Sequence, residues 1–305
     1  MREVFLKIQN LILQAMQFLK PTSPSARLDA EVIIADVLNC RREDLYVRSK
    51  EELEGAVLQK CLQNIERRIQ GEPVSYITNK KDFLNYTFYV QEGVLIPRPE
   101  TELLVEYVLH WIEQQKLKDN IWILDLGCGS GCIGISILKE VFKVNVVAVD
   151  VSATAIETTQ KNATDLGVTD KITTLQKDAD KLSYKDFEFL KTKGFSGTFD
   201  VVISNPPYIA TDDTNVEANV KKYEPKEALY CEKNGLEKIE KWTNTAGCML
   251  KDNGLWIFEI GASQGVSAEK IVNESGFFAD TQIAQDYSGY DRFIIATKKK
   301  IEKNN

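Results

Sequence analysis

The segment Ser204-Asn205-Pro206-Pro207-Tyr208 carries groups suited to holding a planar nitrogen. It follows the apolar run Phe199–Ile203, and ligands of open α/β sheets bind beyond the carboxyl ends of such strands. The Asn205 side-chain carbonyl and the Pro206 main-chain carbonyl can each accept one N–H bond from an NH2 group, orienting its nitrogen and offsetting the positive charge that develops there. The two prolines stiffen the loop, and Tyr208 offers a flat face. This pattern indicates chemistry on an amide or aromatic amine that needs no strong base.

A glycine-rich turn, Asp125-Leu126-Gly127-Cys128-Gly129-Ser130-Gly131, follows the apolar run Ile121–Leu126 and precedes a helical stretch at 133–139. Glycines let the backbone turn sharply and approach a ligand closely. Dinucleotide sites use a similar turn, so the turn alone does not identify the ligand. The GxGxG spacing after an acidic residue suits a nucleoside with a charged amino-acid tail better than a pyrophosphate. We expect the turn to bind a cofactor through Gly127, Cys128, Gly129, Ser130 and Gly131.

Two acidic residues follow the next two strand-like runs. Asp150 lies about 20 residues past the glycines, where an acid commonly accepts hydrogen bonds from ribose hydroxyls. NAD and S-adenosylmethionine sites share this arrangement, so Asp150 does not choose between them. Asp178 lies where an acid could meet an adenine amino group, with Ala179 beside it; the alternative is a cap at the strand end.

Composition argues against several other functions. The one histidine, His110, lies in a helical pattern over 101–115, which argues against a histidine triad or a multi-histidine metal site. None of the six cysteines is spaced as CxxC, and we expect reduced, mostly buried thiols. The net charge of −7 disfavours binding to nucleic acid through phosphates. The Lys298–Lys300 run is predicted to be a solvated tail.

Targeting signals are also missing from the pattern. The chain has 305 residues and no apolar run of about 18, so we expect no membrane span. The N-terminus has no unbroken apolar stretch of the secretory type, and a cytoplasmic protein is expected.

The spacing of apolar residues divides the chain into three parts. Steps of three and four predict helices over 5–19, 28–38 and 53–69, and hence a helical domain over residues 1–78. Residues 79–96 are predicted to form a β-hairpin linker. Residues 97–305 alternate helices with apolar runs, which predicts a mostly parallel sheet covered on both faces, with the last two strands antiparallel. The predicted strands are 121–126, 144–150, 172–176, 199–204, 254–259, 281–284 and 293–297.

Together the motifs resemble class I S-adenosylmethionine methyltransferases of the NPPY type, over about residues 97–298. Val94–Glu102, which reads VLIPRPETE, is similar to the signature of the HemK/PrmC family, the N5-glutamine methyltransferases of class-1 peptide chain release factors. Further similar segments extend the resemblance to about residues 25–298: Arg27–Ala30, Tyr223–Pro225 with Ala228-Leu229, Phe258–Gly261 with Gln264, and Gly289–Arg292.

The resemblance implies a Rossmann-like α/β fold with a seven-stranded, mostly parallel sheet, an antiparallel last strand and a small N-terminal helical domain that recognises the substrate. It implies methyl transfer from S-adenosylmethionine, leaving S-adenosylhomocysteine, to the glutamine of the Gly-Gly-Gln motif of a release factor, a step linked to translation termination. Asn205, Pro206 and Tyr208 would be catalytic, and Pro207, Arg98 and Thr101 would join them in binding the substrate. Asp150, Asp178, Ala179, Asn205 and the glycine turn would bind the cofactor. No metal and no membrane partner are implied, and we expect a monomer.

Alternatives remain. A sister family methylates glutamine in a ribosomal protein, and other NPPY enzymes methylate adenine or guanine in nucleic acid; a non-catalytic module that kept the fold is a further possibility. Arg98 could instead form an ion pair with a neighbouring acid. The chain departs from the family at Ala179, where a tryptophan is common, and at Tyr230–Gly235, where a glycine-rich stretch is usual.

Overall fold

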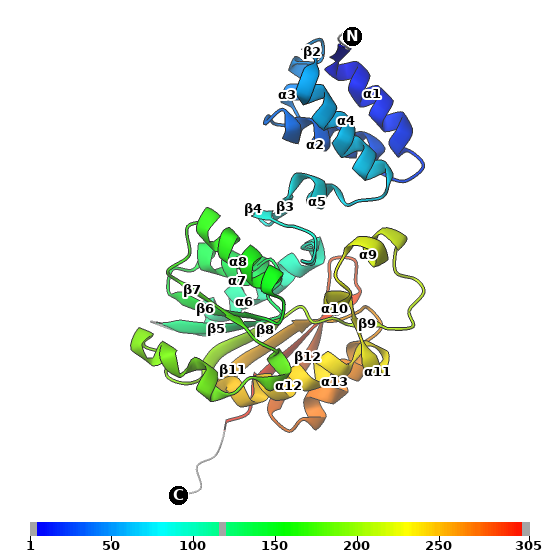
Figure 1. Cartoon of the computed structure of the whole chain (residues 1–305). Coiled ribbons are helices and arrows are strands. Elements are labelled where there is room, and N and C mark those ends of the chain that lie inside the picture. Colours follow the sequence, from blue (N-terminus) through cyan, green and yellow to red (C-terminus); the bar gives the residue numbers. More distant parts are fainter. Residues whose placement is uncertain (1–4, 116–119, 301–305) are drawn as a thin grey trace, which may run out of the picture. The chain divides into compact units, whose positions relative to one another are not determined.

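The computed structural model describes residues 5–115 and 120–300, which fold into two compact units (Figure 1). The first unit is the chain up to Lys80 together with Glu217–Tyr223. The second unit is Lys81–Val216 and the chain from Glu224 onward. None of the helices in these described ranges is long and apolar enough to cross a membrane.

The first unit is built around three helices, α1 (Ile8–Leu19), α2 (Ala26–Val37) and α4 (Gly55–Ile69), coloured blue to cyan in Figure 1. Their apolar residues meet in one buried cluster, which confirms the three predicted helices. Asp29 of α2 is 7% exposed and accepts a hydrogen bond from the Arg68 guanidinium of α4 at 2.7 Å. Smaller elements complete the unit: α3 (Asp44–Val47), α5 (Val74–Thr78), α9 (Ala218–Tyr223) and the antiparallel pair β1 (Leu6–Lys7) and β2 (Glu52–Leu53).

Residues 217–223 were not expected in the helical unit, because they lie far along the chain. Both the Lys222 ammonium and the Tyr223 hydroxyl donate to the Gln70 carbonyl at 3.1 Å. The hairpin, expected as a separate linker, is grouped with the second unit and is shorter than predicted. It consists of β3 (Lys80–Phe83) and β4 (Tyr86–Tyr89), and the apolar residues Val90, Val94 and Ile96 after it are buried but lie outside any strand.

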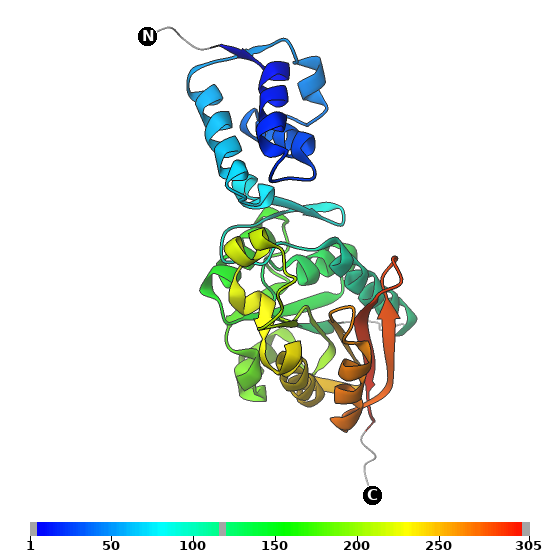
Figure 2. The ribbon, with the colours of Figure 1, turned by 90° about the vertical axis from the view of Figure 1, so that its right-hand side faces the viewer.

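A seven-stranded sheet forms the second unit, in the order β12-β13-β11-β8-β5-β6-β7. Only β13 runs against its neighbours, β11 and β12; Figure 2 shows β12 and β13 in orange and red at one edge of the sheet. This confirms the predicted α/β class with a mostly parallel sheet and an antiparallel last strand. The strands are β5 (Ile121–Leu126), β6 (Val144–Asp150), β7 (Ile172–Gln176), β8 (Phe199–Ser204), β11 (Leu250–Glu259), β12 (Phe278–Gln285) and β13 (Asp291–Lys298).

Alternate residues of each central strand serve two separate cores. Ile121 and Ile123 of β5 join the core under α6 (Glu102–Gln115), α7 (Cys132–Glu140) and α8 (Ala153–Asp165), while Trp122 and Leu124 face the opposite core. That second core includes residues of α12 (Glu237–Met249) and α13 (Gly265–Glu274). Because both faces are covered, the strands read as continuous apolar runs. Short elements connect these layers: η1 (Pro99–Thr101), η2 (Ala179–Lys181), η3 (Tyr184–Lys193), β9 (Ile209–Ala210), α10 (Lys226–Leu229), β10 (Tyr230–Cys231) and α11 (Glu232–Gly235).

Further details of the prediction were wrong. β12 begins at Phe278, three residues before its predicted start. β11 begins at Leu250, four residues before the predicted start, because the polar residues 251–253 hide a strand segment whose register shifts before Leu255. Lys298 is not part of a solvated tail: it ends β13, is 8% exposed, and its ammonium donates to the Gly247 carbonyl. The six cysteines are free thiols and four of them are buried, as expected.

Candidate active site

The glycine turn connects β5 to α7. Gly127 has a φ of 70°, and a Cβ placed on it would lie 2.9 Å from the Trp242 ring, so a side chain is excluded by both backbone and space. Gly129 also has a positive φ, of 56°, but a Cβ there would meet nothing within 4 Å. The turn is therefore packed against the protein at Gly127 and open at Gly129, as a ligand-binding turn requires.

Asp150 ends β6, the strand beside β5, and its carboxylate reaches the glycine turn. One oxygen accepts from the Gly129 amide at 3.0 Å, and the other accepts from the Ser152 amide at 2.9 Å. Burial raises the pKa of Asp150, while these backbone hydrogen bonds oppose the rise. The structure thus brings together Gly129 and Asp150, two of the predicted cofactor-binding residues.

Asp125 precedes the turn and is 1% exposed. Its Oδ2 accepts from the Gly134 amide at 3.3 Å, whereas its Oδ1 is buried without a hydrogen-bond partner in the described structure. Burial, helped by the negative charge of Asp150, raises the pKa of Asp125 to about 7. A buried carboxylate oxygen without a partner costs free energy, which a cationic group on a ligand would recover.

Asp178 and Ala179 lie just beyond β7, which ends at Gln176. The Asp178 carboxylate accepts from the Asp180 amide at 3.0 Å and caps the start of η2, whereas the alternative interpretation expected a cap at the strand end. Ala179 is buried in the core that contains Trp242. Trp242 is the aromatic residue that packs against the glycine turn, and its indole N–H donates to Asp180 at 2.8 Å. Its position in α12 gave no sign of this in the sequence.

The Asn205–Tyr208 loop begins directly after β8, next to the glycine turn. β8 pairs with β5, so that Ser204 lies opposite Leu126, and the Ser204 hydroxyl donates to the Leu126 carbonyl at 2.8 Å. Pro206 and Pro207 are buried, while Asn205 and Tyr208 are partly exposed. The predicted catalytic segment and the predicted cofactor turn therefore lie at the ends of adjacent strands.

Two side chains hold the loop through its main-chain carbonyls. The Cys231 thiol donates to the Pro207 carbonyl at 3.0 Å, and the Gln264 amide donates to the Tyr208 carbonyl at 2.9 Å. Across the described residues, no hydrogen bond reaches the Pro206 carbonyl. The loop thus offers a free main-chain acceptor at the position where the sequence analysis placed one.

A chain of hydrogen bonds links the loop to the buried end of β11. The Glu259 carboxylate accepts from the Tyr208 hydroxyl at 2.9 Å and from the Thr101 hydroxyl at 2.5 Å. The Asn205 amide donates in turn to the Thr101 hydroxyl oxygen at 3.2 Å. Burial raises the pKa of the Glu259 carboxyl. Burial also raises the pKa of the Tyr208 hydroxyl far above its usual range, and the negative charge of Glu259 adds to this effect. Glu259 was not among the predicted site residues.

Arg98 and Thr101, which were predicted to bind the substrate, both form hydrogen bonds within the chain. The Arg98 guanidinium donates to Glu224 at 2.6 Å, the ion pair considered as its alternative, and the other Glu224 oxygen accepts from the Ile96 amide at 3.1 Å. Arg98 keeps a side-chain exposure of 32%. Thr101 is 1% exposed and lies behind Asn205, so its hydroxyl serves the protein's own network.

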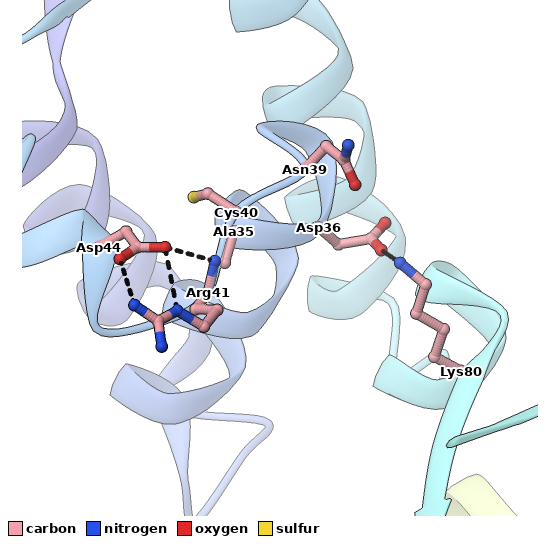
Figure 3. A pocket seen from close by; sticks show the side chains of 7 residues that line it. All are labelled: Ala35, Asp36, Asn39, Cys40, Arg41, Asp44 and Lys80. Atoms are coloured by element: carbon pink, nitrogen blue, oxygen red, sulfur yellow. Dashed lines mark hydrogen bonds and ion pairs between the residues drawn. The ribbon is translucent and has the colours of Figure 1, made fainter. Parts of the chain in front are cut away.

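Other sites offer less chemistry. His110 is exposed on α6 and contacts Gln114. Within the described ranges, no group of three or more histidine, cysteine or acidic residues could hold a metal ion. Figure 3 shows a pocket of the helical unit in which Arg41 pairs with Asp44, and Lys80 with Asp36. These charges are satisfied by one another, and none of the predicted site residues lines this pocket.

Comparison with known proteins gives consistent matches. Residues 10–78 match the family model of the PrmC N-terminal domain, and residues 101–222 match that of the methyltransferase small domain. A release factor glutamine methyltransferase of Chlorobaculum tepidum is 35% identical over 87% of this chain and 88% of that protein. One of Clostridium acetobutylicum is 33% identical over 96% of this chain and 99% of that protein. A bifunctional methyltransferase of Rickettsia prowazekii is 34% identical over 88% of this chain but only 52% of its own length.

Proposed function

Because this chain belongs to the HemK/PrmC family of release factor glutamine methyltransferases, we propose that it methylates the side-chain nitrogen, N5, of the glutamine in the Gly-Gly-Gln motif of class-1 peptide chain release factors. S-adenosylmethionine is the proposed methyl donor. The observation that carries the proposal is a pair of hydrogen-bond acceptors, Asn205 Oδ1 and the Pro206 carbonyl, at the end of the strand beside the glycine turn.

The residues around the turn fit the proposed donor. Gly129 leaves open space where a Cβ would stand, and Asp150 already reaches this part of the turn with a carboxylate that can accept from ribose hydroxyls. The unpartnered Asp125 oxygen suits the cationic amino group of the amino-acid tail. When bound, S-adenosylmethionine supplies an electrophilic methyl group.

The loop residues compensate for the low nucleophilicity of an amide nitrogen. The nitrogen lone pair of a primary amide is delocalised, and the nitrogen becomes positively charged as its bond to the methyl carbon forms and the carbon–sulfur bond breaks. Two carbonyl oxygens that accept its two N–H bonds fix its direction of attack and stabilise that charge. The nitrogen then loses one proton, ultimately to water, so the site needs no histidine or other strong base.

The choice of a release factor rests on the relatives from Chlorobaculum tepidum and Clostridium acetobutylicum, which are release factor glutamine methyltransferases. The ribosomal-protein alternative involves the same glutamine chemistry and therefore the same acceptors. Methylation of adenine or guanine in nucleic acid is disfavoured by the net charge of −7, because proteins that bind the phosphate backbone usually present a positively charged surface.

The deciding experiment uses the full chain, labelled S-adenosylmethionine and an unmodified release factor, followed by mass spectrometry of the product peptides. We expect one methyl group on the glutamine of the Gly-Gly-Gln peptide. The Asn205→Ala variant should lose at least about a hundredfold in rate, because one of two charge-stabilising acceptors is gone, and should keep most of its affinity for S-adenosylmethionine. If a ribosomal protein is methylated and the release factor is not, the proposed substrate is wrong. Unchanged turnover by Asn205→Ala would refute the acceptor mechanism.

A further inference from the structure

We propose that Thr101 and Glu259 are positioning residues that fix the orientation of the Asn205 amide, so that its oxygen and not its NH2 group faces the substrate nitrogen. This inference rests on the proposed function, in which the loop holds a substrate NH2 group. It assigns a role to two residues that touch the loop from behind and do not contact the reacting atoms.

Glu259 is 1% exposed and ends β11 directly after the apolar residues Leu255–Phe258. Burial raises the pKa of Glu259, but the hydrogen bonds from Thr101 and Tyr208 and the charge of Arg292 oppose that rise and favour the ionised form. The ionised carboxylate has no proton to give, so it can only accept hydrogen bonds. Its Oε1 accepts from Tyr208 and its Oε2 from Thr101. Both oxygens are therefore occupied by hydroxyl protons, and the two hydroxyls are committed as donors toward Glu259.

The Thr101 hydroxyl determines which end of the Asn205 amide faces it. A threonine hydroxyl has one proton and two lone pairs, and the proton is given to Glu259 at 2.5 Å. Toward Asn205 the same oxygen can only accept, and the Asn205 NH2 group lies 3.2 Å from it. Because Nδ2 is held on the Thr101 side, Oδ1 is turned to the other side, where no group of the described chain donates to it.

Shape alone could not make this choice. The two ends of an asparagine amide are almost the same size, so either orientation fits the same space, and only hydrogen bonds distinguish them. A flipped amide would direct N–H donors at the N–H donors of the substrate. It would also place a positive dipole end near a nitrogen that becomes cationic, which opposes the reaction.

The first test compares Thr101→Val, which replaces the hydroxyl by a methyl group of similar size, with Thr101→Ser, which keeps it. We expect kcat to fall about tenfold or more in Thr101→Val, the effect of one lost orienting hydrogen bond, while KM for the release factor and the Kd of S-adenosylmethionine change less than about threefold. Thr101→Ser should stay within about threefold of the wild type in kcat. Wild-type kcat in Thr101→Val, or an equal loss in Thr101→Ser, would overturn the proposal.

A second readout needs no substrate. In protein labelled with ¹⁵N at asparagine, the Asn205 side-chain signal is identified by its loss in Asn205→Ala. We expect this signal to shift in Thr101→Val and to keep its position in Thr101→Ser. If the wild type fails to methylate any release factor but this pattern is seen, the proposed substrate is wrong and the orienting role of Thr101 is supported. If the signal does not shift in Thr101→Val, Thr101 does not orient Asn205, whatever the substrate is.

A double variant tests the direction of the network. In Glu259→Leu the Thr101 hydroxyl loses its acceptor and can donate to Asn205 Oδ1, which would flip the amide, so we expect a larger fall in kcat than in Thr101→Val. Adding Thr101→Val to Glu259→Leu removes that misdirected proton, and kcat of the double variant should be no lower than that of Glu259→Leu alone. Losses that multiply would mean that the two residues act independently. If Glu259→Leu does not fold, the Thr101 pair decides alone.

Discussion

Replacing Gly235 by alanine should disable the catalytic loop without touching the cofactor turn. Gly235 ends α11 with a φ of 82°, and a Cβ built on it would lie 2.0 Å from the Tyr208 main-chain oxygen and 2.6 Å from the Gln264 side-chain nitrogen. Real Cβ contacts are essentially never shorter than 3.0 Å, so the Tyr208 backbone must move by about 1 Å. The same Cβ meets the amide of Gln264, which donates to the Tyr208 carbonyl.

The size of the effect follows from that displacement. A misplacement of about 1 Å at a reacting group costs on the order of a hundredfold in rate. The left-handed backbone adds about 1–2 kcal/mol of destabilisation for any residue with a Cβ. Gly235→Ala should therefore lose about a hundredfold in single-turnover methyl transfer at saturating S-adenosylmethionine, with a modest fall in the melting temperature and unchanged cofactor affinity by calorimetry.

Gly276→Ala is the matched control. Gly276 has a similar φ of 76°, but a Cβ there meets nothing within 4 Å. Its variant should show the same backbone destabilisation and near-normal turnover. If Gly235→Ala and Gly276→Ala have equal turnover, then contact with Tyr208 does not position the loop, and the reasoning fails.

Two further predictions concern the cofactor turn. Asp150→Ala should weaken S-adenosylmethionine binding by about 1–3 kcal/mol in calorimetry, since hydrogen bonds to a charged group are lost; equal affinity would show that Asp150 does not meet the ribose. The pKa of Asp125 is about 7 in the folded chain and 3.8 in its ordinary state, so the folded chain holds this proton more tightly than the unfolded chain. Without cofactor, the free energy of unfolding should therefore fall as the pH rises from about 4 through 7. Asp125→Asn cannot ionise, so its melting temperature should fall less than that of the wild type between pH 5 and 8, and parallel curves would contradict the burial of this carboxyl.

The sequence predicted the central sheet well because parallel strands buried on both faces leave a strong signal. β5, β6, β7 and β8 have the predicted bounds, and the acidic and glycine residues that follow them mark the ligand end of the sheet. Polar strand ends and short strands leave weaker signals, which is why the start of β11 and the extent of the hairpin were missed.

The residues behind the loop could not be found from spacing. Thr101 and Asn205 are 104 residues apart and Thr101 and Glu259 are 158 apart, so only the tertiary fold brings them together. One local signal existed: a glutamate inside the apolar run Leu255–Ile260 is rarely buried without partners. The departure from the family at Tyr230–Gly235 also has a structural consequence. Lys233 and Asn234 adopt left-handed φ values of 54° and 57°, and glycine is better suited to this backbone conformation.

The loop's hydrogen bonds, taken together, favour one kind of substrate. Cys231 and Gln264 occupy the carbonyls of Pro207 and Tyr208, and the Asn205 NH2 group is occupied by Thr101. The acceptors that the loop leaves open include Asn205 Oδ1 and the Pro206 carbonyl. A neutral NH2 group has two protons to match them, whereas a carboxylate would meet them with oxygens and a hydroxyl could satisfy only one. Since buried polar groups left unpaired cost about 1–3 kcal/mol each, this polarity alone favours an amide over the corresponding acid.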